Sequence, residues 1–243
     1  MRMYTFAKRN AKEILRDPIN LCFGLGFPLV LLLLLCAIQA NVPVALFEIR
    51  QLAPGIAVFG LSFLTLFCAT LIAKDRTGAL LQRLYTTPLQ ASDFILGYGL
   101  PILPIAVVQS VVCYGVAICL GLEITGNILL AVAMIVPVSI LYIALGLLCG
   151  SVFTDKQVGG ICGALLTNLS AWLSGVWFDL ELMGEGFQKA ANLLPFVHAV
   201  ALERAALSGN TEAMLPHLWW VLGYGLGLAV LAVAVFLHRM RTQ

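Results

Sequence analysis

Charged side chains are scarce in this chain and are missing from six long stretches of it. Asp, Glu, Lys and Arg make up only 11% of its 243 residues, whereas hydrophobic residues make up 61%, and the mean hydropathy is +0.99. Soluble domains carry about 25% charged residues, and a water-soluble fold could not bury so much apolar surface. The scarcity of charge therefore excludes a soluble globular domain and predicts an integral membrane protein.

A second absence concerns nucleotide chemistry. The sequence contains no GxxxxGK[ST] phosphate loop and no other nucleotide-binding fingerprint. We therefore expect the chain to bind no cofactor of its own and to be unable to hydrolyse ATP by itself. Charged residues inside the apolar stretches, which proton- or sodium-coupled transporters usually need as relays, are missing as well. An external source of energy is therefore favoured.

Each charge-free stretch is long enough to cross a bilayer core of about 30 Å as a helix. The stretches are residues 19–39, 52–73, 97–121, 128–152, 158–178 and 216–238. The expected fold class is all-α: a polytopic membrane protein with six transmembrane helices and one domain that covers residues 1–243. The seven cysteines all lie within these stretches, where they behave as small apolar residues and show no disulfide or metal-binding spacing.

The basic residues indicate an orientation. Six crossings put both termini on one side of the membrane, and that side holds all of the 14 Lys and Arg except Arg50, Lys189 and Arg204. Because basic residues near span ends are retained on the cytoplasmic side, we expect a multi-pass protein of the plasma (inner) membrane with both termini cytoplasmic. The net charge of +2 reflects this topology, so it indicates no nucleic-acid partner.

Residues 1–18 predict an amphipathic helix that precedes the first span. At 100° per residue, apolar side chains such as Phe6 and Ile14 share one face, while basic ones such as Lys8, Arg9 and Lys12 share the other. Such a helix lies in the cytoplasmic interface with its basic side chains toward anionic membrane lipid. The alternative is an ordinary basic tail beside the membrane.

The loop at residues 74–92, on the predicted cytoplasmic side, has the pattern of a short exposed helix. Leu80, Leu81 and Leu84 lie within one helical turn between Gly78 and Pro88. An apolar ridge of this kind suits a groove on a partner protein. On spacing alone, a connector that lies against the membrane is about equally compatible.

The external segment at residues 179–215 is interrupted rather than continuous. Gly184, Gly186 and Pro195 break apolar stretches that are too short to span a bilayer. This pattern predicts re-entrant helices that dip into the outer leaflet. The alternative, a plain surface loop, would expose apolar residues such as Leu193 and Phe196.

Both loop segments resemble the ABC-2 type transporter permeases. In that family, the loop between the second and third membrane helices carries an acidic-basic stretch, then Gly, Thr, Leu, a charged residue, Leu and Thr-Pro-Leu. This chain departs from the pattern at Ala79, where Thr is commoner. The resemblance implies that Arg76 to Leu89 form a coupling helix that docks on an ATP-binding subunit. The residues assigned to this coupling are Asp75, Arg76, Gly78, Leu80, Leu81, Arg83, Leu84, Thr87, Pro88 and Leu89.

The external segment resembles the same family less specifically. There the fifth helix ends in a Ser-Gly-aromatic signature, followed by re-entrant helices, a Leu-x-Pro stop and a later Arg. The corresponding residues here, beyond Ser174, are Gly175, Phe178, Leu194, Pro195 and Arg204. Asp179 stands where the family often has Pro, which leaves the geometry of that turn open.

The fifth stretch carries small residues on one face. Gly160, Gly163, Thr167, Ser170 and Ser174 recur at steps of three and four, and Asn168 lies beside them. Small residues allow helices to approach closely. The face could meet a partner subunit or line a substrate path, or it could pack within one subunit, and the sequence favours neither.

The resemblance implies the membrane permease subunit of an ABC exporter, which is not an enzyme by itself. Its partners would be two copies of an ABC ATPase, which hold ATP and Mg²⁺, and a second permease chain in a homo- or heterodimer. The apolar interior favours a hydrophobic, amphipathic or lipid-linked substrate.

Two other classes of function compete with this interpretation. A membrane immunity or assembly factor would act by binding alone, and the loop at residues 74–92 argues against it. An intramembrane hydrolase would have to use Ser174 with His198 or His217, but Leu173-Ser174-Gly175 does not supply the GxSxG-like turn of such enzymes.

Overall fold

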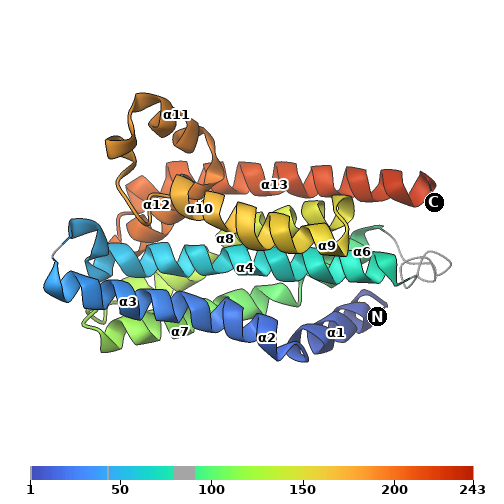
Figure 1. The fold of residues 1–243 in the computed structure, drawn as a ribbon, viewed down its shortest axis with the longest axis horizontal. Helices are drawn as coiled ribbons and strands as arrows, with labels where there is room; N and C mark the ends of the chain where they lie inside the picture. The colour runs from blue at the N-terminus through green and yellow to red at the C-terminus, as the bar shows by residue number, and fades with distance from the viewer. Residues whose placement is uncertain (1, 43, 79–90, 243) are drawn as a thin grey trace.

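A computed structural model describes residues 2–42, 44–78 and 91–242 of the chain, and all regular structure in these residues is helical (Figure 1). The longer elements are α3 (Phe27–Asn41), α4 (Ile49–Thr77), α7 (Ile102–Cys119), α8 (Asn127–Val152) and α13 (Thr211–Thr242). The N-terminal elements are α1 (Arg2–Leu15), α2 (Pro18–Leu21) and the π-helical η1 (Cys22–Gly26). The remaining elements are η2 (Ala45–Phe47), α6 (Ala91–Gly99), α9 (Asp155–Val158), η3 (Gly159–Leu166), α10 (Thr167–Leu173), η4 (Leu180–Met183), α11 (Glu185–Leu193) and α12 (Pro195–Ser208).

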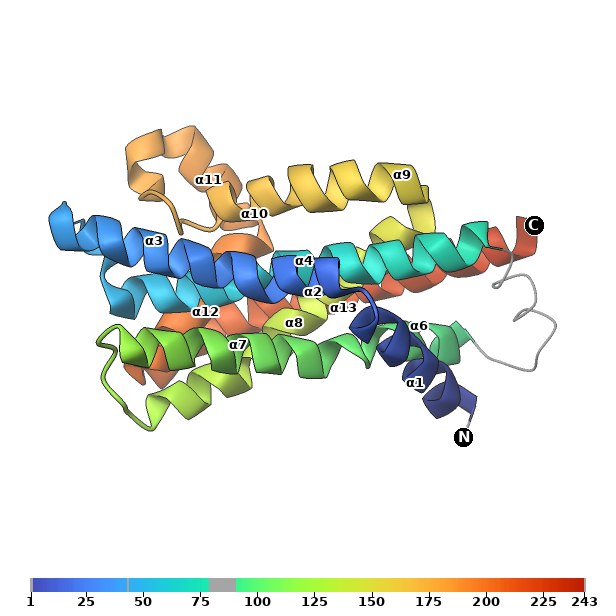
Figure 2. The same cartoon turned by 60° about the horizontal axis from the view of Figure 1, so that its bottom comes forward.

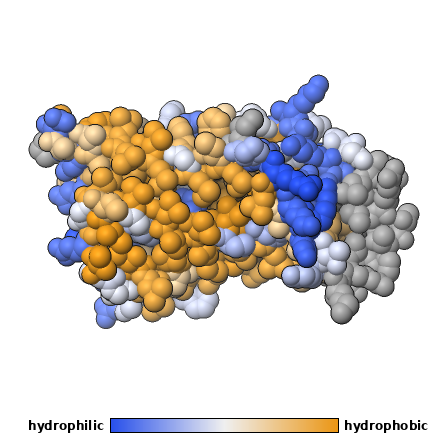
Figure 3. Space-filling view, turned by 90° about the horizontal axis from the view of Figure 1, so that it is seen from below, coloured by the Kyte–Doolittle hydropathy of each residue, from blue (hydrophilic) through white to orange (hydrophobic). Residues whose placement is uncertain are grey.

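Five helices among the described residues are long and apolar enough to cross a membrane. They are Cys22–Asn41, Ile49–Thr77, Asp93–Cys119, Asn127–Val152 and Thr211–His238. They run along the long axis of the molecule, and both chain termini lie at one end, which we call the terminal end (Figure 1). A broad hydrophobic surface lies between hydrophilic residues at the two ends (Figure 3). Exposed side chains such as Val30, Val112 and Leu226 contribute to the apolar exterior.

The remaining predicted span, residues 158–178, differs from the other five. A helical run extends from Asp155 to Leu173 through α9, η3 and α10, and Thr154 begins it with a capping box that includes Gln157. The run lies beside α4 (Figure 2). Helical structure ends at Leu173, before the predicted boundary, and Gly175 then takes a positive φ of 69°.

Helix α4 is the centre of the fold. Within its most apolar stretch 89% of the residues are buried, against 22% to 44% in the other four candidate spans. It packs against α3, α7, α8, α12 and the helical run from Asp155 to Leu173. Because α4 is surrounded on most sides, its small residues set how closely its neighbours approach.

Helices α4 and α8 approach each other closely at two glycines of α8. A Cβ atom on Gly146 would lie 2.8 Å from the carbonyl oxygen of Thr65, and one on Gly150 would lie 2.8 Å from that of Ala69. The two glycines are four residues apart and therefore share a face of α8. The Thr65 hydroxyl donates to the carbonyl oxygen of Tyr142 at 2.8 Å, which links the two helices further.

We expect Gly146→Ala to destabilise the bundle, because its methyl group would overlap Thr65 and Cys68. Overpacking of this kind costs about 1–3 kcal/mol. The control is Gly115→Ala in α7, where an added Cβ meets nothing within 4 Å. Thermal unfolding of the two purified variants in the same detergent compares them. Equal unfolding temperatures would contradict the close approach of α4 and α8.

Candidate functional site

A groove lies against α4, between the N-terminal helices and the helical run from Asp155 to Leu173. Its volume is about 730 Å³, which lies within the range of roughly 300–1,000 Å³ that is typical of small-molecule sites. The lining contains no Asp, Glu, Lys or Arg and is rich in aromatic rings, including Phe27, Phe63 and Trp172. The groove therefore offers an apolar, uncharged surface.

Both side walls of the groove contain π-helical turns. One wall includes Phe23 of η1, and the other includes Gly159 and Gly163 of η3. Such turns are rare and frequently occur at functional sites. The Thr167 hydroxyl donates to the carbonyl oxygen of Cys162 at 2.9 Å, so this backbone carbonyl of η3 has a side-chain hydrogen-bond partner.

The small residues predicted on the fifth stretch divide between two environments. Ser170 is buried and shares a hydrogen bond of 2.7 Å with the Tyr142 hydroxyl, and Ser174 donates to the carbonyl oxygen of Ala171 at 3.0 Å. Thr167, Gly163 and Asn168 line the groove, and the Asn168 amide donates to the carbonyl oxygen of Ala164. A Cβ on Gly160 would meet nothing within 4 Å. The face thus provides both internal packing and groove surface.

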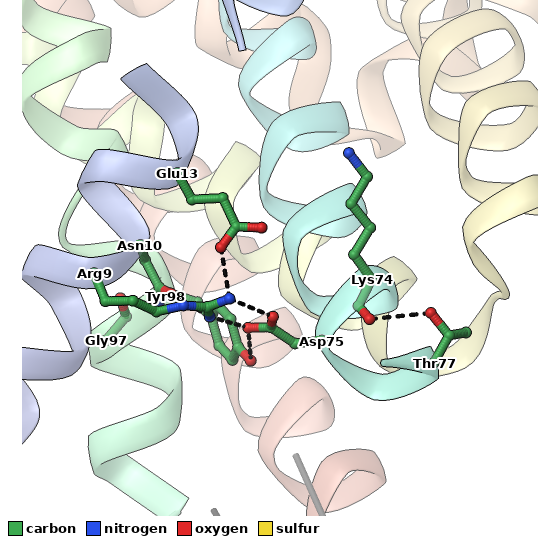
Figure 4. A network of polar contacts seen from close by, with 8 residues as sticks. All are labelled: Arg9, Asn10, Glu13, Lys74, Asp75, Thr77, Gly97 and Tyr98. Carbon is green, nitrogen blue, oxygen red and sulfur yellow. Dashed lines mark hydrogen bonds and ion pairs between the residues drawn. The ribbon is translucent and has the colours of Figure 1, made fainter. Parts of the chain in front are cut away.

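A polar cluster lies at the terminal end of α4, where the predicted coupling loop begins (Figure 4). Arg9 contacts both carboxylate oxygens of Asp75, and its Nη2 atom donates to Oδ1 at 2.7 Å. The Tyr98 hydroxyl donates to Asp75 Oδ2 at 2.9 Å. Glu13 forms an ion pair with Arg9, with 2.6 Å between Oε2 and Nη2. The hydrogen bond to Asp75 raises the pKa of Arg9, so the guanidinium stays charged.

Arg76 and Gly78 complete the described part of the predicted coupling set. The Arg76 guanidinium donates to the carbonyl oxygens of Ser151 and Phe153, at the end of α8. Gly78 follows α4 and donates its backbone N–H to the carbonyl oxygen of Lys74 at 2.8 Å. The other members lie outside the described residues; they are Leu80, Leu81, Arg83, Leu84, Thr87, Pro88 and Leu89.

At the opposite end, Arg204 joins the predicted external residues to α4. Its guanidinium donates to the carbonyl oxygens of Gly175 and Gln51, at 3.2 Å each. Leu194 precedes α12 in an extended conformation, and Pro195 occupies the first turn, where a proline is well tolerated. Phe178 packs its ring on that of Phe187 in α11, with 6.4 Å between the centroids.

The turn at Asp179 has an ordinary backbone geometry. Asp179 itself is extended, with a φ of −68°, and η4 begins at the next residue. Such a φ is also the one that proline adopts. The aspartate therefore keeps a backbone angle compatible with the proline that is common there in the family.

Sequence reasoning missed a buried acid at this opposite end. Glu203 lies in the segment that we predicted as external and re-entrant; its side chain is fully buried and accepts a hydrogen bond of 3.0 Å from the Tyr114 hydroxyl. Its Oε1 atom has no hydrogen-bond partner among the described residues. Burial raises the pKa of Glu203 well above its ordinary value, and the hydrogen bond from Tyr114 offsets only part of this rise. No pattern in the sequence indicated this burial.

The two candidate histidines of the hydrolase hypothesis contact each other. Their Nδ1 atoms are 2.9 Å apart, and Nε2 of His198 lies 2.9 Å from the carbonyl oxygen of Asn192. Ser174 donates to the carbonyl oxygen of Ala171, and among the described residues no hydrogen bond joins it to either histidine. Within the same residues, no three His, Cys, Asp or Glu side chains are grouped to hold a metal ion.

Comparison with protein families decides between these classes. The family model of the ABC-2 type transporters matches residues 1–207. The chain belongs to the ABC-2 type transporter family. No curated protein matches it. The match extends from α1 almost to the end of α12, so it covers the polar cluster, the groove and Arg204. The chain is therefore a multi-pass membrane permease of an ABC transporter, a class of subunit that is generally not catalytic itself and works in general with an ABC ATPase.

We expect Glu203→Gln to remove a pH-dependent cost in stability. Because the unfolded carboxyl releases its proton at lower pH than the folded one, stability falls as the pH rises above about 4.5. The glutamine variant should therefore be more stable than the wild type at pH 8, by about 1–3 kcal/mol, and similar to it at pH 5. Thermal unfolding in detergent at the two pH values measures this difference. A difference that does not change with pH would contradict a raised pKa at Glu203.

Proposed function

We propose that this permease exports a hydrophobic, amphipathic or lipid-linked substrate with energy from ATP that a separate subunit hydrolyses. The observation that carries the proposal is the uncharged, aromatic groove of about 730 Å³ beside α4. An apolar lining favours apolar cargo, because burying a charge without a partner costs several kcal/mol. The groove opens along the face that would contact lipid, which suits a substrate that enters from the bilayer.

In this proposal the chain crosses the membrane six times, and both of its termini lie in the cytoplasm. Helix α8 ends near the terminal end and α13 begins at the opposite end (Figure 1), so the chain between them has to cross the bundle. The helical run from Asp155 to Leu173 supplies that crossing. We propose one transmembrane domain, residues 1–243, in the plasma membrane, with α1 at the cytoplasmic interface and residues 179–215 as the external re-entrant segment.

Coupling to ATP hydrolysis is assigned to residues 74–92. The end of α4 and the start of α6, which flank this segment, lie toward the terminal end of the bundle (Figure 1), where a cytoplasmic ATPase would dock. Because one chain supplies a groove rather than an enclosed path, we propose an assembly of two permease chains and two ATPase subunits. The helical run from Asp155 to Leu173 forms the face toward the second permease chain or the substrate.

We expect the ATPase subunit to co-purify with the wild type and to be lost when Arg83 and Leu84 are both changed to Ala. The double change removes a charge and an apolar contact from the proposed docking ridge. The matched control is Lys189→Ala with Leu193→Ala, which removes the same kinds of side chain from exposed positions in α11 at the other end. Retention of the ATPase by the Arg83 and Leu84 variant would refute coupling through this loop.

The groove is tested by Trp172→Ala, which removes an exposed ring from its wall. We expect at least a severalfold loss of the resistance to membrane-active compounds that the transporter restores to a deletion strain, at unchanged amounts of protein. The control is Trp219→Ala, because Trp219 is also exposed but lies on a separate apolar surface of α13, away from the groove. Similar effects of the two substitutions would argue against the groove as the substrate path.

A further inference from the structure

Two histidines connect three helices at the end opposite the chain termini. His198 belongs to α12 and His217 to α13, and their Nδ1 atoms are 2.9 Å apart. Nε2 of His198 lies 2.9 Å from the carbonyl oxygen of Asn192, near the end of α11. The pair therefore links α11, α12 and α13 at this end of the molecule (Figure 1).

The last two carbonyl groups of α11 both meet side chains of neighbouring helices. Carbonyls in the last turn of a helix have no partner within it. His198 bonds the carbonyl of Asn192, and the Tyr224 hydroxyl of α13 donates to the next one, that of Leu193, at 2.5 Å. The Trp220 ring stacks on both of these side chains, with centroids 4.8 Å from His198 and 5.8 Å from Tyr224. The end of α11 is thus attached to α12 and α13 through these contacts.

The hydrogen bonds limit how many protons the pair can hold. A carbonyl oxygen only accepts, so Nε2 of His198 carries a hydrogen, and one hydrogen can lie between the two Nδ1 atoms. The neutral pair meets this condition when His217 donates, and a singly charged pair meets it with either ring protonated. Two positive charges would place two N–H groups against each other. The contact therefore accepts one added proton and excludes a second.

The surroundings of the pair offer a second positive charge no acidic partner. In the part of the chain that the structure describes, no ion pair joins either histidine to a carboxylate. The titratable and charged groups on the adjoining elements have other partners or are exposed; they are Glu203 with Tyr114, Tyr142 with Ser170, Arg204 with backbone carbonyls, Glu185 with Lys189, Arg50 with Glu123, and the exposed Asp179, Glu181 and Glu212. A single positive charge is favoured, by contrast, because the face of Trp220 attracts a cation.

We propose that His198 and His217 form a proton-sensitive latch, which holds the external re-entrant segment on α13 and opens when both imidazoles are protonated. The proposed external position of residues 179–215 means that the acidity of the outer medium acts on it. The latch goes beyond the proposed transport, which does not require one. Opening releases α11 and the first turn of α12 from α13, whereas Arg204 still bonds α12 to the start of α4.

Proton linkage gives the direction and size of the effect. The open pair takes up two protons and the closed pair one, so acid favours opening. An imidazole in water has a pKa of about 6.5, and the extra proton therefore raises the opening equilibrium by about twentyfold between pH 8 and pH 5. Glu203 has the opposite effect, because its cost in stability grows as the pH rises. An opening in acid is therefore not caused by Glu203.

Hydrogen–deuterium exchange of the permease in nanodiscs measures this opening at residues 185–200, which cover α11 and the start of α12. Exchange rates at pH 8 and pH 5 are divided by the intrinsic rates at each pH, so that the resulting protection factors can be compared. We expect the protection of these residues in the wild type to fall about twentyfold at pH 5. Equal protection at the two pH values would overturn the latch.

Two substitutions remove the excess of protons and keep a hydrogen-bond donor. His217→Asn places an amide near the position of Nδ1, where it can donate to His198 or accept from it without titrating. His198→Gln keeps an N–H for the carbonyl of Asn192 and removes the second imidazole. We expect protection that does not depend on pH in both variants. The matched control is His238→Asn at the other end of α13, which should retain the wild-type fall.

Thermal unfolding of each variant at both pH values is recorded beside the exchange. If His217→Asn does not fold, His198→Gln carries the same expectation. A wild-type fall in protection in either variant, or the loss of that fall in His238→Asn, would also overturn the latch. The measurement uses neither substrate nor ATPase, so a failure of the proposed transport would leave its outcome unaffected.

Discussion

The burial of α4 is the constraint on which the rest of the structure depends. A single helix contacts α3, α7, α8, α12 and the run from Asp155 to Leu173, so its side chains determine the spacing of most of the bundle. Lipid provides no hydrophobic force between helices, and close packing and hydrogen bonds have to hold them together. Along α8, Gly146 and Gly150 allow close packing against α4, and the Thr65 hydroxyl adds a hydrogen bond to the carbonyl oxygen of Tyr142.

The two ends and the open side of α4 carry the features with a functional interpretation. At the terminal end, Asp75 and Arg76 bond α1, α6 and the end of α8, and at the opposite end Arg204 bonds the residues around the start of α4. Between these ends, the groove lies against aromatic side chains of α4 that are themselves largely buried. The same helix therefore carries the polar cluster at its terminal end and forms the floor of the groove.

The irregular turns lie where the helices have to combine packing with an open surface. The π-helical segments η1 and η3 stand on opposite walls of the groove, and both contain glycines. A Cβ on Gly24 would overlap the Phe67 ring, so this wall approaches α4 as closely as a glycine permits. The glycines of the sequence indicated close approach of helices, but the positions of the π-helical turns had no sequence signal, since they depend on which neighbours each turn contacts.

The sequence by itself determined the membrane environment, the helical class and the family, because charge-free stretches and local loop motifs are properties of the chain in order. It also indicated the break at Pro195, where α12 begins. Only the tertiary structure decided that Asp75 and Arg76 face inward, that Glu203 is buried, and that Phe6 packs on α6. These outcomes depend on contacts between residues far apart in sequence, such as Arg9 with Asp75 and Tyr114 with Glu203, which no local pattern encodes.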